Sequence, residues 1–429
     1  MDVAWILLVR ASCRGRRIMV RIERGARPLK KPCALWSWAA LSSLRSCLLN
    51  PGDAPSRGDG STGDWGVFRG DMDVMGQHLP VQTMTRRNLL GLLPMFVASV
   101  AGGQDERPDA LESRIDESIR RALHWLAGEQ QASGAWTTND FGESTATTAL
   151  AIMAFLAGGH VPGEGPYGRH LPRGLAWLMS QQQENGLLVG RDGGHGPMYS
   201  HGIATLMLAE ISGMVDTAQA EACRDCLRRA VKLIVDAQNH PKPPEHDGGW
   251  RYQPTSGDSD LSVSAWQLLA LRAAKDIGCD VPAENIDRAV AYLKRLHVKH
   301  DGGFGYMVGH GSTITRAGTG ITALEVCGEH RTVETLAAAR MILSRPLVRT
   351  EHYFFYGAYY CTIGMYKVGG AEWQQSREAL YRTILDLQNP AGFWTPEDGT
   401  ERQAGKVYST SLSVLALAIE YGYLPIYQR

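Results

Sequence analysis

The stretch WLAGEQQASGAW at residues 125–136 decides the fold, because variants of it recur along the chain. It combines an aromatic-Leu pair with Gln130, Gly134 and Trp136 at fixed offsets. The stretch TILDLQNPAGFW at residues 383–394 repeats the Gln, the Gly and the Trp at the same spacing. Self-similarity with a period of about 20–50 residues is typical of architectures built from stacked repeats. We therefore expect further copies between these two.

Three further copies are centred on Gln182, Gln238 and His297. Together with the two outer copies, the five marker positions lie 52, 56, 59 and 91 residues apart. The last gap is nearly two repeats long, so we expect a degenerate copy near residues 339–344.

Each marker is expected to end one helix, and a second helical pattern follows it after a Gly-rich loop. In the third of these patterns, Leu261, Ala265 and Leu268 share one helical face. The second helices are rich in Ala, Gly, Ser and Thr and suit a closely packed inner ring, whereas the first helices carry more charge and suit an outer ring. Six pairs predict an all-α fold, an (α/α)6 toroid barrel over residues 105–429. The predicted inner helices are 144–157, 200–213, 259–274, 315–327, 353–368 and 409–421.

The aromatic-Leu-x3-Gln-x(2–5)-Gly-x-Trp repeat resembles the QW motif of squalene–hopene cyclases, and more broadly the prenyltransferase and squalene cyclase α/α-toroid superfamily. The resemblance covers nearly all of residues 115–429 and rests on five copies. It implies the toroid fold and a polyprenyl or triterpene-type ligand, which a cyclase of this class cyclises after protonating it. The alternative is structural: each Gln bonds the loop backbone and the helix terminus, and each Trp packs against the neighbouring unit.

The sequence GDSDLS at residues 257–262 resembles the Asp-x-Asp-Asp general-acid motif of those cyclases. Asp258 and Asp260 match its first and second Asp, and the resemblance makes Asp260 the proton donor. Leu261 replaces the third Asp. Protonating an alkene requires a carboxylic acid that stays protonated, and an apolar cavity with a neighbouring carboxylate raises the pKa of one acid of such a pair. The alternative is a helix N-cap, a position that Asp and Ser favour.

Aromatic and polar side chains on or beside the expected starts of the inner helices are candidates for lining a binding site. Aromatic faces stabilise carbocations and equally line sites for apolar or sugar ligands. Singly, each also fits ordinary core packing. His201 fits a hydrogen-bonded polar residue better than a base, and Arg316 is expected to pair with an acid. The candidates are Tyr199, His201, Trp266, Arg316, Tyr353, Phe354, Tyr356, Tyr360 and Tyr408.

Three functions stay open. The first is a terpenoid-cyclase-like enzyme that takes an apolar, polyprenyl or triterpene-like small molecule. The second is a non-catalytic toroid that binds a lipid, a peptide or a glycan. The third is a polysaccharide hydrolase or lyase that uses paired carboxylates. Its carboxylates would come from Glu143, Asp258, Asp260, Glu397 and Asp398.

Charge and motif content exclude several other classes. The 44 basic and 44 acidic residues are unevenly placed, because residues 1–104 carry 14 Lys or Arg and 7 Asp or Glu. The body after residue 104 is therefore acidic by seven charges, which argues against a nucleic-acid partner. It contains no run of about 20 apolar residues that would span a membrane, although peripheral contact stays open. The lone Cys223–Cys226 pair does not predict zinc, and no phosphate loop is present. We expect no metal and no cofactor.

The N-terminal region indicates export. Arg86 and Arg87 directly precede an apolar run at 89–100 and a small-residue site, which is the layout of an export signal and resembles a twin-arginine signal. We expect a signal at residues 84–104 that starts at Met84, and a bacterial periplasmic or secreted protein. Residues 1–83 would then be wrongly translated upstream sequence; the alternative is a disordered basic leader followed by an apolar helix.

Overall fold

The computed structural model describes residues 110–190 and 196–428, and the backbone of residues 5–11, 18–24, 71–74 and 77–80. The chain divides into two units, Met1–Gln104 and Asp105–Arg429. The described residues of the first unit form two antiparallel hairpins. The predicted signal at 84–104 lies outside the described residues, as does most of the predicted leader. The strands are β1 (Trp5–Ala11) paired with β2 (Ile18–Arg24), and β3 (Asp71–Val74) paired with β4 (Gln77–Pro80).

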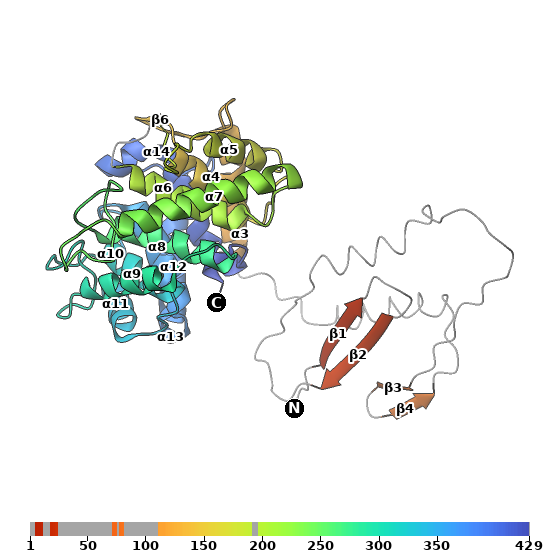
Figure 1. Ribbon diagram of the computed structural model, residues 1–429. Coiled ribbons are helices and arrows are strands. Elements are labelled where there is room, and N and C mark those ends of the chain that lie inside the picture. Colours follow the sequence, from red (N-terminus) through yellow and green to blue (C-terminus); the bar gives the residue numbers. More distant parts are fainter. Residues whose placement is uncertain are drawn as a thin grey trace. The chain divides into compact units, whose positions relative to one another are not determined.

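The described part of the second unit consists of two rings of helices (Figure 1). The outer ring contains α3 (Ala110–Gly128), α5 (His170–Ser180), α7 (Thr217–Gln238), α9 (Ala283–Arg295), α11 (Val333–Ser344) and α13 (Gly370–Leu385). The inner ring contains α4 (Thr145–Ala157), α6 (Pro197–Ile211), α8 (Leu261–Asp276), α10 (Ile314–Val326), α12 (Phe354–Val368) and α14 (Gly399–Leu417). Each inner helix packs on the next, and α14 returns to α4. The predicted toroid of six helix pairs is therefore confirmed, and α11 occupies the position of the degenerate copy.

Small residues bring the inner helices together, as their composition predicts. At the contact between α10 and α12, a Cβ added to Gly318 would lie 2.6 Å from the backbone N of Cys361. At the contact between α6 and α8, a Cβ on Gly202 would lie 2.4 Å from the Gln267 side chain. Larger side chains would force these helices apart, because protein interiors have no spare volume at such contacts.

The repeated Gln ties each repeat to the next. Gln130 Nε2 donates to the carbonyl of Gly134 in its own loop and to the carbonyl of His170 in the next outer helix, both at 2.9 Å. The same pair of bonds recurs at Gln182, Gln238 and Gln388. The last one reaches Ser118 of α3 and closes the outer ring. The predicted bond from Gln to its loop is confirmed, but the second partner lies in the following helix.

The Trp of the repeat fixes the same loop from the other side. Trp136 Nε1 donates to the carbonyl of Leu126 at 2.7 Å, and Leu126 belongs to the outer helix of the same repeat. Its ring also packs on the following repeat, because a Cβ added to Gly174 of α5 would meet it at 2.9 Å. Trp250 and Trp394 make equivalent bonds to the outer helices that precede them.

Two features depart from the repeat. At the fourth copy His297 replaces Gln, and its Nε2 is buried without a hydrogen-bond partner among the described residues. The last inner helix begins at Gly399 rather than near residue 409, because a short helical segment continues into it across a kink at Gly405, where φ is 90°. A short hairpin, β5 (Thr137–Thr138) with β6 (Gly142–Glu143), precedes α4. Two 3-10 turns, η2 (Ile419–Tyr421) and η3 (Pro425–Tyr427), end the described chain, and no described helix is long and apolar enough to cross a membrane.

Gly392→Ala should destabilise the protein by about 3 kcal/mol, because residue 392 has a φ of 103° and an added Cβ would lie 2.4 Å from the Arg121 carbonyl. Urea unfolding measures the loss. Gly399→Ala is the matched control, because nothing lies within 4 Å of its Cβ. Equal stability of the two variants would contradict this account of the ring closure.

Candidate functional site

The starts of the inner helices all lie at one end of the inner ring, which we call the mouth. Side chains cap several of these starts. Asp260 caps α8 through a bond from Val263 N, and Thr313 caps α10 through a bond from Arg316 N. Such caps satisfy backbone N–H groups that have no partner within the helix. Capping therefore draws polar side chains to the mouth.

Asp260 is a fully buried carboxyl whose two oxygens face different partners. Its Oδ1 accepts from Val263 N at 2.9 Å, so the predicted capping alternative is confirmed. Its Oδ2 lies 3.2 Å from Arg251 Nε. Burial raises the pKa of Asp260 to about 6, against the opposing effects of the Val263 N–H and of Arg251. A carboxyl that titrates near neutrality at a helix start is a candidate for acid–base chemistry.

One arginine faces both acids of the 257–262 stretch. Arg251 Nη1 lies 2.8 Å from Asp258 Oδ2, and the same guanidinium meets Asp260 through Nε. A single positive charge neutralises only one carboxylate, so the cluster is neutral when the other carries a proton. Asp260 is fully buried, whereas the Asp258 side chain is 45% exposed. The proton therefore belongs on Asp260, because burial penalises its charged form most.

Two tyrosines that the sequence analysis missed surround this cluster. The Arg251 guanidinium lies 4.6 Å from the ring centre of Tyr252 and 5.5 Å from that of Tyr306. The two phenol oxygens lie 2.6 Å apart, and the Leu261 N–H donates to the Tyr306 carbonyl. Each tyrosine stands two residues after the closing aromatic of a repeat, Trp250 and Phe304. This shared offset is the signal that would have found them.

Two of the predicted tyrosines lie near Asp260. Burial, followed by the Asp260 carboxylate, raises the pKa of Tyr199 well above its usual value. Burial raises the pKa of Tyr356 to about 12, and Asp260 adds to this rise. The Tyr199 ring lies 6.0 Å from that of Tyr252. Neutral phenol rings therefore surround the carboxyl.

Below the mouth, aromatic rings fill the space between α8 and α12. Trp266 stacks on Tyr359 with ring centres 5.6 Å apart and meets Tyr360 at 5.4 Å. Tyr356 packs on Tyr360 at 4.6 Å. All four side chains are at most 9% exposed. Towards the other end of the ring, the Tyr359 hydroxyl contacts that of Tyr427 in η3. The predicted Trp266 and Tyr360 are thus core residues that support the mouth from beneath.

The other predicted residues lie apart from Asp260 or have different partners. His201 bonds the Leu188 N–H and the Ala230 carbonyl, and burial lowers its pKa to about 4, so it is a neutral residue between α6 and α7. Arg316 donates to the Gly311 carbonyl and to Thr313, and within residues 110–190 and 196–428 it forms no ion pair. The expected acid partner of Arg316 was therefore wrong.

The remaining aromatic candidates lie at the start of α12 and in the neighbouring α14. Phe354 is buried against Phe355, whereas Tyr353 is 46% exposed. Burial, followed by the Glu401 carboxylate, raises the pKa of Tyr408. Glu401 itself is a buried acid at the mouth that the sequence analysis did not identify, because it precedes the predicted start of the last inner helix.

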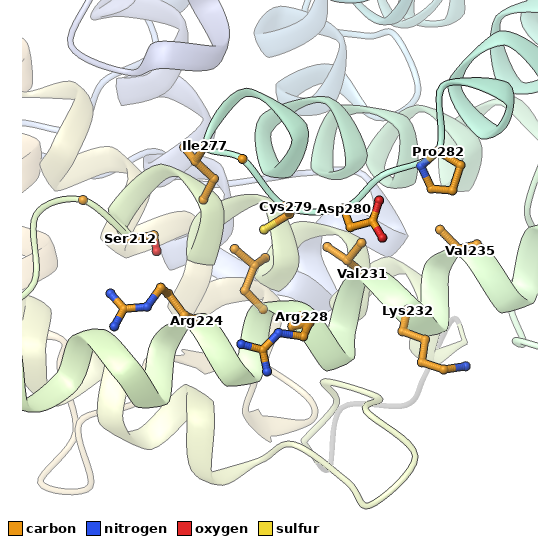
Figure 2. Close-up of a pocket in the computed structure, with 13 residues that line it drawn as sticks. Ser212, Arg224, Arg228, Val231, Lys232, Val235, Ile277, Cys279, Asp280 and Pro282 are labelled. Atoms are coloured by element: carbon orange, nitrogen blue, oxygen red, sulfur yellow. The ribbon is translucent and has the colours of Figure 1, made fainter.

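A separate groove of about 640 Å³ lies outside the ring, along α7 (Figure 2). Leu227, Val231 and Ile277 form its apolar part. The basic side chains Arg228 and Lys232 also line it, but they pair with Asp225 and Asp236 of the same helix. None of the predicted site residues lines this groove. In the described residues, no three His, Cys, Asp or Glu side chains gather as metal ligands would.

No protein-family model and no curated protein matches the chain. Among solved structures, it is similar to the α-1,6-mannanase GH76A of Salegentibacter sp. HEL1_6, as an inactive variant with α-1,6-mannotriose. The TM-score is 0.54 at 12% identity, over 71% of this chain and 98% of that one. The type II terpene cyclase MstE from Scytonema gives a TM-score of 0.49 at 17% identity, over 73% of this chain and 99% of that one. The mannanase similarity supports the toroid fold.

Asp260→Asn should change how stability depends on pH. The folded-state pKa of Asp260 is raised by burial to about 6 from its ordinary value of 3.8. The stabilisation from the neutral carboxyl is therefore complete below about pH 4 and is lost as the pH rises through about 6. Relative to wild type, the unfolding free energy of Asp260→Asn should rise by roughly 3 kcal/mol between pH 4 and pH 7.

Urea unfolding at several pH values measures this difference, and the fixed loss of the cap cancels because only its change with pH matters. Asp280→Asn, at an exposed acid of the groove, is the control and should follow wild type. Parallel curves for Asp260→Asn and wild type would contradict a raised pKa at Asp260.

Proposed function

We propose that the chain is a terpenoid-cyclase-like toroid that takes a polyprenyl or triterpene-type chain at the mouth and starts its cyclisation by protonation from Asp260. The observation that carries the proposal is a fully buried carboxyl with a pKa of about 6 among tyrosine rings. Such a group keeps its proton up to about pH 6, well above the range of an ordinary carboxyl, and it lies where water does not compete for the proton. The comparisons support only the toroid fold beneath this proposal.

The proposed step moves one proton from Asp260 to a terminal alkene carbon. A C–H bond forms, the alkene becomes a tertiary carbocation, and the next double bond attacks it to close a ring. The faces of Tyr199 and Tyr356 stabilise the cation through their π electrons. Loss of a proton from the final cation completes an isomerisation, and Asp260 regains a proton from solvent.

Arg251 explains how the acid would work with Leu261 in place of the third Asp of the motif. After the proton leaves, the Asp260 carboxylate lies 3.2 Å from the guanidinium, which stabilises it. Before the proton leaves, Asp258 already neutralises that guanidinium, so Asp260 is not forced to ionise. The ion pair thus lowers the free-energy cost of proton transfer from Asp260, while Asp260 can still be protonated before the reaction.

A second function, ligand binding without catalysis, is favoured by the filled ring interior. Trp266, Tyr359 and Tyr360 occupy the space in which a cyclase would fold a long substrate. A ligand that stays at the mouth would contact the tyrosines there without entering the ring. Under this function Asp260 and Arg251 would orient a polar group of the ligand.

A glycan hydrolase is the third candidate, since the α-1,6-mannanase shares the fold. A hydrolase needs two carboxyls with access to the glycosidic bond. Here Asp258 and Asp260 meet one arginine, and Glu143 bonds Ser133. The remaining two, Glu397 and Asp398, pair with Arg349 and His352. Because each candidate carboxyl already contacts another side chain, the hydrolase is the least favoured of the three functions.

We further propose that the protein acts outside the cytoplasm, after export through the signal at residues 84–104. The support is the Arg86-Arg87 pair before an apolar run. An exported toroid would meet its lipid at or near a membrane.

Incubating the purified protein with squalene or geranylgeraniol should give cyclised products, identified by gas chromatography and mass spectrometry. Asp260→Asn should lower product formation at least about 100-fold, because it removes the general acid. Asp280→Asn should match wild type, since that acid is exposed in the groove.

A binding measurement with labelled geranylgeraniol separates the candidate functions. Binding without product in wild type favours the non-catalytic toroid. If wild type shows no binding and forms no product, the lipid proposal is wrong. Cleavage of α-1,6-linked mannan in a parallel assay would then favour the hydrolase.

A further inference from the structure

Residues 397–404 form a short segment at the mouth, which we call the strap. It contains the beginning of α14 and ends at the kink at Gly405, where φ is 90° and ψ is −174°. A Cβ added to Gly405 would lie 2.7 Å from Asn139 Oδ1, so the kink is fixed both by conformation and by space. The strap is thus set at an angle to the inner helix that follows it.

On one side the strap caps α12. The Tyr353 residue before α12 has a left-handed backbone, with φ at 57°, and its side chain makes no capping bond among the described residues. Glu401 supplies the cap instead, since its two carboxylate oxygens accept from Phe355 N at 3.2 Å and Tyr356 N at 2.9 Å. Glu401 is only 2% exposed. Asp398 adds a bond with His352 Nδ1 at 2.7 Å.

On the other side the strap is bonded to the β5–β6 hairpin of the first repeat. Asn139 Nδ2 donates to the Arg402 carbonyl at 2.7 Å. The backbone N–H groups of Asn139 and Asp140 donate to the Gln403 carbonyl at 3.1 and 3.3 Å. These are a few polar bonds at an exposed turn, which is typical of segments that open locally.

The strap lies beside the aromatic residues of the mouth. Glu401 bonds the backbone of Tyr356, the tyrosine whose pKa Asp260 influences. Burial first, and then Glu401, Tyr356 and Tyr353, raise the pKa of Tyr408. Release of the strap would therefore expose the start of α12 and the Tyr356 and Tyr408 rings.

We propose that the strap is a pH-sensitive gate over this sector of the mouth, held closed when the buried Glu401 carboxyl is neutral and loosened when it is ionised. Opening would take Glu401 into water. That the gate admits a ligand rests on the proposed function of the mouth, whereas its opening is a property of the ligand-free protein.

The direction follows from the environment of Glu401. Burial raises its pKa to about 7, more than the Tyr356 and Phe355 N–H groups lower it, while Asp398 adds a further rise. In the open strap the carboxyl would return to an ordinary pKa near 4.5. A proton therefore binds the closed strap more tightly than the open one. The ratio of closed to open strap falls by up to about tenfold for each pH unit between about 5 and 7 and levels off above that range.

Other ionisable groups face Glu401. The connection before α12 carries His352 and Tyr353, and α12 carries Tyr356. Asp398 precedes α14, α14 carries Tyr408, and the neighbouring hairpin carries Asp140 and Glu143. Burial raises the Asp398 pKa, but bonds from His352 and the Thr400 backbone outweigh it and leave the pKa low. Asp398 therefore stays ionised from pH 5 to 8. His352 carries the imidazole that bonds Asp398.

Hydrogen exchange of the ligand-free full chain, followed by mass spectrometry from pH 5 to 8, tests the gate. Protection factors, corrected for intrinsic exchange, are expected to fall about 40-fold between pH 5 and 7 in peptides covering 353–357 and 397–404. Peptides from α8 and α10 should stay more protected than these at every pH, because their amides exchange only when the whole ring unfolds. Glu401→Gln, which resembles the neutral acid, should remove the dependence and be more protected than wild type at pH 8.

Two variants serve as matched controls. Glu397→Gln changes an exposed acid of the same strap, and His352→Gln removes the neighbouring histidine; both should keep the dependence. A flat wild-type profile, an unchanged slope in Glu401→Gln, or loss of the slope in His352→Gln would each overturn the proposal. Protection of the strap equal to that of α8 and α10 at every pH would show that the strap opens only by global unfolding and would also overturn the proposal. None of these results depends on ligand binding, so the gate can be contradicted without contradicting the proposed function, and the reverse also holds.

Discussion

The glutamine amide that joins consecutive repeats is the interaction on which the structure depends. Each Gln Nε2 satisfies two carbonyls, one in a loop held at a positive-φ glycine and one in the following outer helix. Buried carbonyls without a donor cost free energy, so the loop and the next helix are favoured only together. Because the bond from Gln388 returns to Ser118, the last repeat depends on the first. The same Gln amide contact therefore joins consecutive repeats and closes the ring.

This closure places all inner helix starts at one end and decides the chemistry there. Helix starts expose N–H groups, and buried ones must be capped from within the protein. Asp260 caps its own helix, and Glu401 caps a neighbouring one. In each case burial raises the pKa, to about 6 and about 7, because the cap lies where water is excluded. Two acids that titrate near neutrality thus follow from a structural need, and their raised pKa values require no separate explanation.

The sequence predicts those features of the fold that are set by residues recurring at fixed offsets. The first inner helix, expected at 144–157, is observed at Thr145–Ala157, because one local period sets both its apolar pattern and its cap. Contacts made across long separations were not predictable in this way. Glu401 bonds residues 45 and 46 positions earlier, and Tyr306 meets Arg251 from the next repeat. Arg316 was assigned an acid because its charge suggested one, yet a carbonyl and a hydroxyl already occupy its donors. Partners of charged groups depend on packing, which spacing does not encode.

The filled interior limits where any ligand can act. Trp266 and three tyrosines pack at ring distances of 4.6–5.6 Å, and moving them would break the contact between α8 and α12. The strap, by contrast, is held by a few polar bonds and one buried carboxyl. A ligand that needs more room than the mouth offers would therefore displace the strap before it displaced the core, since local opening follows the weakest set of contacts. Tyr356 lies directly beside that weakest part, because Glu401 bonds its backbone. Under the proposed gate, the ionisation of Glu401 would therefore control access to the α12 side of the mouth.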